Sequence, residues 1–243
     1  MAEGAFDVLL LVGRPASGKS EIIDFLTRAP LEERRQKFHV AELDVLDDFP
    51  MLWAWFEEDH ILTERFGQPR LHTEAEGYFK YPYLWHLLIE RLDLEYHKRL
   101  RDDPAYHDRV TTLIEFSRGS EHGGYAEALP HLSDGLLRRA GVVYVSVSFE
   151  ESLRKNRRRF NPDRPDTILE HGLPDEKLER LYRDDDWGAL SGGKESGLLA
   201  VKGVRVPFVV LGNEGNLENI VDEGKLADVL DSLWRRAINR PTA

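Results

Sequence analysis

The eight residues Gly13–Ser20 constrain the fold of this chain more than any other feature. Their sequence, GRPASGKS, is a complete G-x-x-x-x-G-K-[ST] phosphate-binding loop. The apolar run 6–12 before it is typical of a buried parallel strand, and residues 21–26 after it carry apolar side chains at helical spacing. In such a unit the loop N–H groups and the positive end of the helix dipole face the same anion. The sequence therefore predicts a phosphate-binding strand–loop–helix unit rather than a Gly/Ser-rich surface loop.

Two side chains of the loop have defined chemical roles. A lysine at the position of Lys19 reaches the β- and γ-phosphates and offsets the charge that develops during transfer, and the Ser20 hydroxyl is the expected Mg²⁺ ligand. The side chains of Arg14 and Ser17 receive no defined role, because the loop backbone does most of the binding. The predicted phosphate-binding residues are Gly13, Arg14, Pro15, Ala16, Ser17, Gly18, Lys19 and Ser20.

Composition narrows the class of protein. A chain of 243 residues accommodates one large α/β domain with an insertion, and we treat residues 1–243 as one domain. The net charge of −11 disfavours a nucleic-acid partner, and the absence of cysteine excludes disulfides and thiolate chemistry. The N-terminus has no basic leader, and the apolar runs fall short of the roughly 20 residues that span a bilayer. We expect a cytoplasmic protein with no membrane partner, and a homodimer is compatible with the sequence.

Four further apolar runs are separated by helical or irregular sequence. They span residues 38–43, 110–116, 142–149 and 204–211. This alternation is typical of a parallel sheet covered by helices on both faces. With the strand before the phosphate loop, the sequence predicts a five-stranded, mainly parallel sheet in an α/β fold.

Residues 45–109 are too many for a simple crossover, and we interpret them as a helical insertion on the side of an acceptor molecule. Asp47 or Asp48 can cap its first helix, and Thr73–Glu76 resembles a capping box before the second. Its aromatic residues are most simply core residues, but a flat substrate ring would need one of them to stack on. The candidates for stacking are Trp53, Trp55, Tyr78 and Tyr81.

Residues 150–203 are interpreted as a lid and a mobile loop. Within them, residues 184–202 are rich in Gly, Ser and charge, which favours the loop. Residues 198–206 offer a weak hairpin signal leading into the fifth strand. The last helix is better marked, with Asp222 as its cap and an apolar stripe behind it.

Acidic residues end two of the predicted strands. Glu115 lies where a second contact to the magnesium shell belongs, although a solvated strand-end glutamate is the simpler alternative. Arg118 follows and can contact a phosphate or pair with Glu115. At the end of the strand 38–43, Asp44 is the candidate base if the acceptor is a hydroxyl, or else an ordinary cap or turn residue. If the acceptor is a phosphate, basic residues such as Arg65 or Arg70 should lie nearby instead.

After the fourth strand comes the basic segment LRKNRRR. On a helix, Arg154, Arg157 and Arg158 share one face and can converge on one anion, or they form a solvated basic surface. The nine histidines show no zinc-binding spacing, and we treat them as structural or surface residues.

The loop GRPASGKS, the segment IEFSRG and the basic segment SFEESLRKNRRR together resemble the P-loop small-molecule kinases, a group that includes nucleoside monophosphate and deoxyribonucleoside kinases. The resemblance implies a three-layer P-loop NTPase fold with sheet order 2-3-1-4-5 and an Arg-rich lid. It implies ATP and Mg²⁺ as cofactors, Lys19 and Ser20 at the donor, and Asp44 and Glu115 at the reacting end. It also implies Arg154, Arg157 and Arg158 on the lid, and Asn213 near the adenine.

The segment around Glu115 and Arg118 matches the kinase motifs only loosely, so the resemblance names no acceptor. The function expected from it is an ATP-dependent transfer of the γ-phosphate to a small nucleoside- or nucleotide-like acceptor. The alternative is a nucleotide-binding switch or NTPase that acts on a protein partner. The chain has no Asn-Lys-x-Asp guanine motif, and its acidic balance counts against a polynucleotide substrate.

Overall fold

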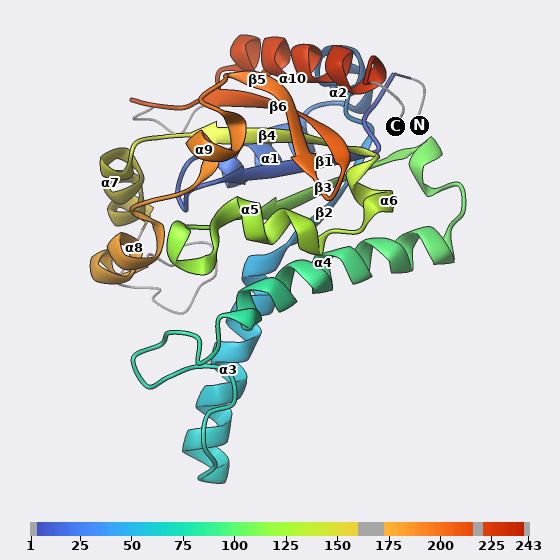
Figure 1. Cartoon of the computed structure of the whole chain (residues 1–243). Helices are drawn as coiled ribbons and strands as arrows, with labels where there is room; N and C mark the ends of the chain where they lie inside the picture. Colours follow the sequence, from blue (N-terminus) through green and yellow to red (C-terminus); the bar gives the residue numbers. More distant parts are fainter. Residues whose placement is uncertain (1–3, 160–172, 216–220, 241–243) are drawn as a thin grey trace.

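The computed structural model describes residues 4–159, 173–215 and 221–240. Six strands form one sheet in the order β2-β3-β1-β4-β6-β5, in which only β5 runs antiparallel to its neighbour (Figure 1). The strands are β1 (Val8–Gly13), β2 (Glu42–Asp47), β3 (Val110–Phe116), β4 (Ala140–Ser146), β5 (Ser196–Val201) and β6 (Val204–Gly212).

Helices cover both faces of this sheet. In the described part of the chain they are α1 (Lys19–Arg28), α2 (Leu31–Phe38), α3 (Asp48–Phe66), α4 (Tyr83–Asp102), α5 (Gly124–Ala128), α6 (Asp134–Leu137), α7 (Phe149–Arg159), α8 (Asp175–Tyr182), α9 (Trp187–Ser191) and α10 (Glu223–Ile238). One apolar core packs α1, α2 and α10 on one face, and the other packs α4, α5, α6 and α9 on the opposite face. The predicted α/β architecture with helices on both faces is therefore confirmed.

The order of the five predicted strands is also confirmed, but the strand count was wrong. β5 adds a sixth, antiparallel edge strand, joined to β6 through Lys202 and Gly203. Both turn residues have positive φ, 48° and 81°, which suits a tight hairpin turn. The mobile loop predicted over 184–202 was wrong as well, because α9 and β5 occupy it. Trp187 anchors this region by stacking on Tyr144, with ring centroids 4.4 Å apart. The rest of the predicted lid, 160–172, lies outside the described residues.

The second strand begins four residues later than its apolar run suggested. Phe38 ends α2, His39 takes a left-handed φ of 54°, and β2 spans Glu42–Asp47. The apolar signal gave the wrong bounds because β2 is an edge strand in which acidic residues interrupt the apolar ones. In consequence Asp47, and not Asp44, lies at the carboxyl end of β2. The register sets Asp47 opposite Glu115.

Two long helices carry most of the insertion, and α3 projects away from the sheet (Figure 1). The predicted cap is confirmed: the Asp47 carboxylate accepts a hydrogen bond from the Phe49 N–H at 2.9 Å. The capping box at Thr73–Glu76 was wrong, because α4 begins only at Tyr83.

Thr73 instead binds Asp59. This buried carboxylate accepts hydrogen bonds from the N–H groups of Leu71 (2.6 Å), His72 (3.1 Å) and Thr73 (2.7 Å) and from the Thr73 hydroxyl (2.6 Å). Four hydrogen bonds on one buried acceptor hold the connection between α3 and α4 against α3.

No helix among the described residues combines the length and the apolar character that a membrane crossing requires.

Candidate functional site

The phosphate loop joins the end of β1 to the start of α1, as the sequence predicts. Two of its glycines have no room for a side chain. A Cβ at Gly13 would lie 2.5 Å from the Val145 carbonyl oxygen, and a Cβ at Gly18 would lie 2.2 Å from Asn213 Nδ2. Gly18 also has a φ of 108°, which other residues rarely adopt. The loop is therefore pressed against β4 and against the segment after β6.

Lys19 is buried beneath this loop, with 4% of its surface exposed. Its Nζ donates to the carbonyl oxygens of Gly13 (3.2 Å) and Arg14 (2.9 Å) and to Ser117 Oγ (2.9 Å). It also lies 3.7 Å from the Glu115 carboxylate. The ammonium group is thus held between the loop and the end of β3.

The neighbouring loop hydroxyls suit phosphate and magnesium. Ser17 Oγ is buried and has no hydrogen-bond partner among the described residues, and Ser20 lines the adjoining cavity. Hydroxyl and carboxylate oxygens are the ligands that Mg²⁺ prefers, and Ser20 and Glu115 supply one of each. Within the described ranges, no group of three or more His, Asp or Glu side chains could hold a metal ion.

The ends of β2 and β3 bring a second acid to Glu115. The pKa of Asp47 is raised to about 7, first by burial and then by repulsion from Glu115 and Asp48. Asp47 lines the same cavity as Lys19. A carboxyl group with such a pKa exchanges its proton near neutral pH, which is the property of a general base.

Arg118 pairs with Asp48 and not with Glu115. The guanidinium is 1% exposed and lies 2.7 Å from the Asp48 carboxylate. It also donates to the carbonyl oxygen of Trp85 at 2.9 Å, which ties β3 to α3 and α4. Burial raises the pKa of Asp48, and Arg118 opposes that rise. Removal of one partner would leave an uncompensated buried charge.

Asp44 lies away from this group of acids. It sits mid-strand opposite Thr112, where its carboxylate accepts from Arg99 Nε (2.5 Å) and from the Tyr106 hydroxyl (2.7 Å). The sequence placed Asp44 at the reacting end because it predicted the second strand at residues 38–43, four residues before β2 (Glu42–Asp47). Asp47 occupies that location.

The three predicted lid arginines do not line the cavity. Arg154 pairs with Glu151 at 2.6 Å, Arg157 pairs with Asp175 at 2.6 Å, and Arg158 is exposed. In this arrangement neighbouring carboxylates bind Arg154 and Arg157.

Other residues of α7 do contact the phosphate loop and the segment after β6. Ser152 Oγ donates to the Pro15 carbonyl at 2.7 Å, and Lys155 Nζ donates to the Asn213 carbonyl at 3.1 Å. Sequence reasoning missed both, since neither stands out beside the arginine run.

A cavity of about 630 Å³ opens from the phosphate loop toward α3, α4 and α8. Of the predicted stacking residues, Trp53 and Tyr78 line it. Trp55 is buried and stacks on His72, and Tyr81 stacks on Tyr83. The aromatic walls of the cavity are Phe49, Trp53, Phe56, Tyr78, Phe79, Trp85, Phe116 and Tyr182.

His122 also lines the cavity, although the sequence suggested no role for it. It stacks on Trp85, with ring centroids 3.8 Å apart. Burial and the nearby Arg118 lower the pKa of His122 to about 3, so its ring is neutral at physiological pH.

A second cavity, of about 340 Å³, adjoins Gly18, Ile22 and Asn213. Asn213 Nδ2 donates to the Ser17 carbonyl at 2.7 Å, which fixes the segment after β6 beside the phosphate loop.

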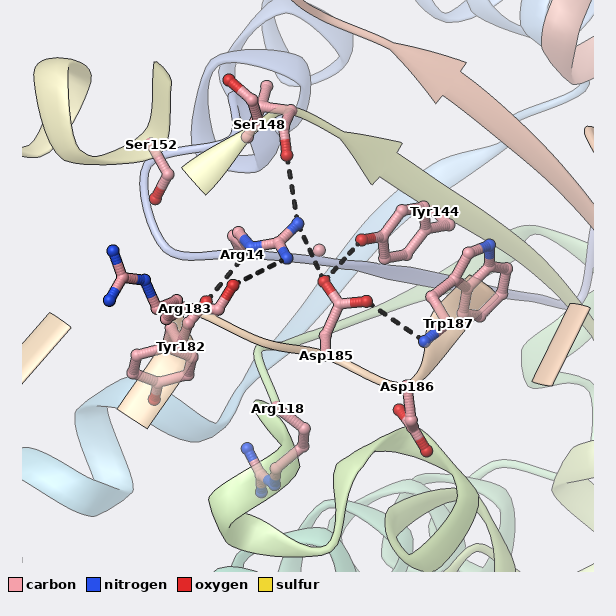
Figure 2. A network of polar contacts seen from close by, with 12 residues as sticks. Arg14, Arg118, Tyr144, Ser148, Ser152, Tyr182, Arg183, Asp185, Asp186 and Trp187 are labelled. Carbon is pink, nitrogen blue, oxygen red and sulfur yellow. Dashed lines mark hydrogen bonds and ion pairs between the residues drawn. The ribbon is translucent and has the colours of Figure 1, made fainter. Parts of the chain in front are cut away.

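The Arg14 side chain points away from the loop and into the protein (Figure 2). It donates to the carbonyl oxygens of Val147, Tyr182 and Arg183, each at 3.1 Å, and pairs with Asp185 at 2.9 Å. Figure 2 shows that the same Asp185 carboxylate accepts from the Tyr144 hydroxyl, at 2.8 Å. Arg14 therefore joins the phosphate loop to the end of α8. Residues of α8 also line the cavity of about 630 Å³, which we call the large cavity.

No protein-family model and no curated protein matches this chain. Three solved structures align over nearly all of it. TT1252 from Thermus thermophilus covers 98% of this chain and 100% of its own, with 16% identity and a TM-score of 0.40. An unliganded sugar kinase from Janibacter sp. HTCC2649 covers 98% and 99%, with 15% identity and a TM-score of 0.39. APE1195 covers 96% and 99%, with 16% identity and a TM-score of 0.39. Similarity this distant identifies no activity or substrate.

Proposed function

We propose that this protein is an ATP-dependent phosphotransferase that moves the γ-phosphate to a hydroxyl group of a small acceptor. One observation carries the proposal: Lys19 of the phosphate loop and the acids Asp47 and Glu115 face the same aromatic cavity. A phosphate site, a group able to take a proton and a space for an organic molecule thus meet at one sheet edge. Ligands bind at this edge in open α/β sheets.

The chain's own residues divide the work as follows. The loop N–H groups and Lys19 bind the donor phosphates, and Ser20 and Glu115 hold the metal. When bound, ATP supplies the phosphoryl group and Mg²⁺ neutralises part of its charge. Asp47 orients the acceptor hydroxyl and takes its proton. Asn213 and the cavity beside it suit the adenine, on the far side of Gly18.

The charges at the reacting end favour a hydroxyl acceptor over a phosphate acceptor. Asp47, Asp48 and Glu115 line the cavity there, and a phosphate dianion would be repelled by these carboxylates. Arg65 and Arg70, which a phosphate acceptor would need nearby, do not line the cavity. The aromatic walls suit a flat ring, so a nucleoside-like acceptor fits best.

The second candidate is a nucleotide-dependent switch. The contact of Arg14 with Tyr182, Arg183 and Asp185 favours it, because a loop that holds α8 can transmit nucleotide occupancy to that helix. In that case the output would be a change in a partner protein's binding and not a phosphorylated product.

The test is ADP release from Mg-ATP in the presence of nucleosides, nucleotides, sugars and amino alcohols. One acceptor class should stimulate release in the native protein, and Lys19→Ala and Asp47→Asn should abolish the stimulation. Phosphorus NMR of the product then separates a new phosphomonoester from a new diphosphate. Tight nucleotide binding without stimulation by any class would favour the switch.

A further inference from the structure

Three basic side chains gather where the α3–α4 connection meets α8. Lys177 Nζ on α8 donates to the Gly77 carbonyl at 3.2 Å, and Lys80 Nζ donates to the Arg70 carbonyl. Figure 1 shows this connection reaching from α3 toward α8. Lys80 and Lys177 line the large cavity, and the charge of Arg70 acts on Lys177. One wall of the cavity, away from the strand ends, is therefore basic.

These three cations have no carboxylate partner. No Asp or Glu of the described ranges lies within 4.0 Å of the charged nitrogens of Arg70, Lys80 or Lys177. Their neighbour Arg180 differs, because it pairs with Glu121 at 2.9 Å and lies 4.1 Å from the centre of the Tyr78 ring. Among the described residues, no carboxylate therefore neutralises the positive charge of the three.

Placing these positive charges close together costs free energy when no anion is bound. Burial lowers the pKa of Lys177, and repulsion from Arg70 lowers it further, while Glu176 on the same helix opposes the shift only in part. In a chain of net charge −11, carboxylates are abundant, yet none of the described ones forms an ion pair with these three cations. An anion bound among the three cations would remove the repulsion and gain charge-assisted hydrogen bonds.

We propose that Lys80 and Lys177, with the charge of Arg70 behind them, form a subsite for a phosphate monoester group that the acceptor already carries. The acceptor would then be a phosphorylated alcohol, with its reacting hydroxyl at Asp47 and its own phosphate at this subsite. The positive charge at this wall is offset better by a phosphate dianion than by the single negative charge of a carboxylate. This inference rests on the proposed phosphotransferase function and narrows its acceptor class.

Phenyl phosphate is a suitable probe, because it has a flat ring and a dianion but no alcohol to phosphorylate. Its binding, with Mg-ADP saturating the phosphate loop, can be followed by tryptophan fluorescence from Trp53 and Trp85 in the cavity wall. Phenol and benzoate are the matched neutral and monoanionic probes. We expect phenyl phosphate to bind about tenfold or more tightly than phenol, since one or two charge-assisted hydrogen bonds add that much, and more tightly than benzoate.

The double variant Lys80→Met with Lys177→Met should remove this preference. Lys194→Met with Arg205→Met, which neutralises two exposed cations on other elements, should keep it. Equal binding of phenyl phosphate and phenol, or a preference that survives in the first variant, would overturn the subsite. Equal binding of benzoate and phenyl phosphate would overturn the assignment of a dianion.

The same titration in Lys19→Ala separates the two proposals. If Mg-ADP fails to bind the native protein, the phosphotransferase proposal fails. The preference for phenyl phosphate in Lys19→Ala still reports on the basic subsite, because the loop lysine is gone. A preference lost in Lys19→Ala would mean that the probe had bound at the phosphate loop, and the subsite would be rejected.

Discussion

The two ends of the large cavity are built in different ways. At the phosphate loop, eight consecutive residues fix the geometry, and two glycines admit the close approach of β4 and of Asn213. At the acceptor end, the walls come from α3, α4 and α8, and a buried hydrogen-bonded carboxylate, Asp59, holds the connection between them. The comparison teaches that the loop end of the cavity is encoded by neighbouring residues, whereas the end that we propose for the acceptor depends on contacts between distant segments.

The largest expected effect is on turnover, when only the phosphate-loop end of the cavity is changed. In Lys19→Ala, Mg-ATP turnover should fall about 10³-fold or more, because the charge developing on the transferred phosphate loses its counter-ion. ADP release measures this, with Lys37→Ala on the exposed side of α2 as the control. Turnover that survives in Lys19→Ala would detach the phosphate loop from the chemistry.

The next largest effect is on stability, when only the acceptor end of the cavity is changed. Asp59→Ala leaves three N–H groups and one hydroxyl without their acceptor, so the free energy of unfolding should fall by about 3 kcal/mol. Urea titration followed by tryptophan fluorescence measures it, and Glu57→Ala, exposed on the same helix, is the control. A loss below about 1 kcal/mol would show that the connection is held by other contacts.

The same carboxylate gives a pH dependence. Burial alone would raise the pKa of Asp59, but the hydrogen bonds from Thr73, Leu71 and His72 outweigh it and lower the pKa to about 2. A depressed pKa contributes stability that is present above the unfolded value of about 4 and is lost as the pH falls toward 2. Acid titration of native protein and Asp59→Ala should therefore converge near pH 2.

A smaller effect sharpens the assignment of the base where the two ends meet. Asp47→Asn should lower kcat by about 10²-fold, while Asp44→Asn should act on stability through Arg99 and Tyr106. Because burial and Glu115 raise the pKa of Asp47 to about 7, kcat/KM for the acceptor should rise with pH through that value. Loss of this limb in Asp47→Asn, with its retention in Asp44→Asn, is the expected pattern. The opposite pattern would return the role to Asp44.

The smallest effect concerns the connection between the two ends. Arg14→Met removes the contacts with Tyr182, Arg183 and Asp185, so amide exchange in α8 should quicken by about tenfold. Hydrogen–deuterium exchange, with and without Mg-ADP, measures this. Arg183→Met keeps the backbone carbonyl that Arg14 binds and should leave exchange near the native rate. Equal exchange in Arg14→Met and native protein would mean that α8 is held by its own packing.

Sequence reasoning succeeded where a signal was local. The phosphate loop, the buried strands and the cap at Asp47 follow from neighbouring residues. It failed at β2, because acidic residues interrupt the apolar residues of this edge strand and leave no continuous apolar run. The error placed Asp44, and not Asp47, at the end of the strand. The hydrogen bonds to Asp59 join residues 12 to 14 positions apart in the chain, and a periodic pattern of apolar residues does not reveal such contacts.

The anchoring of Arg14 also bears on how the chain is made. The Tyr182 carbonyl that Arg14 binds follows Arg14 by 168 positions in the chain, and Asn213, which donates to the Ser17 carbonyl, comes later still. Contacts at such separation form late in folding. A growing chain would therefore carry the complete loop sequence without its final shape until Asn213 has been made.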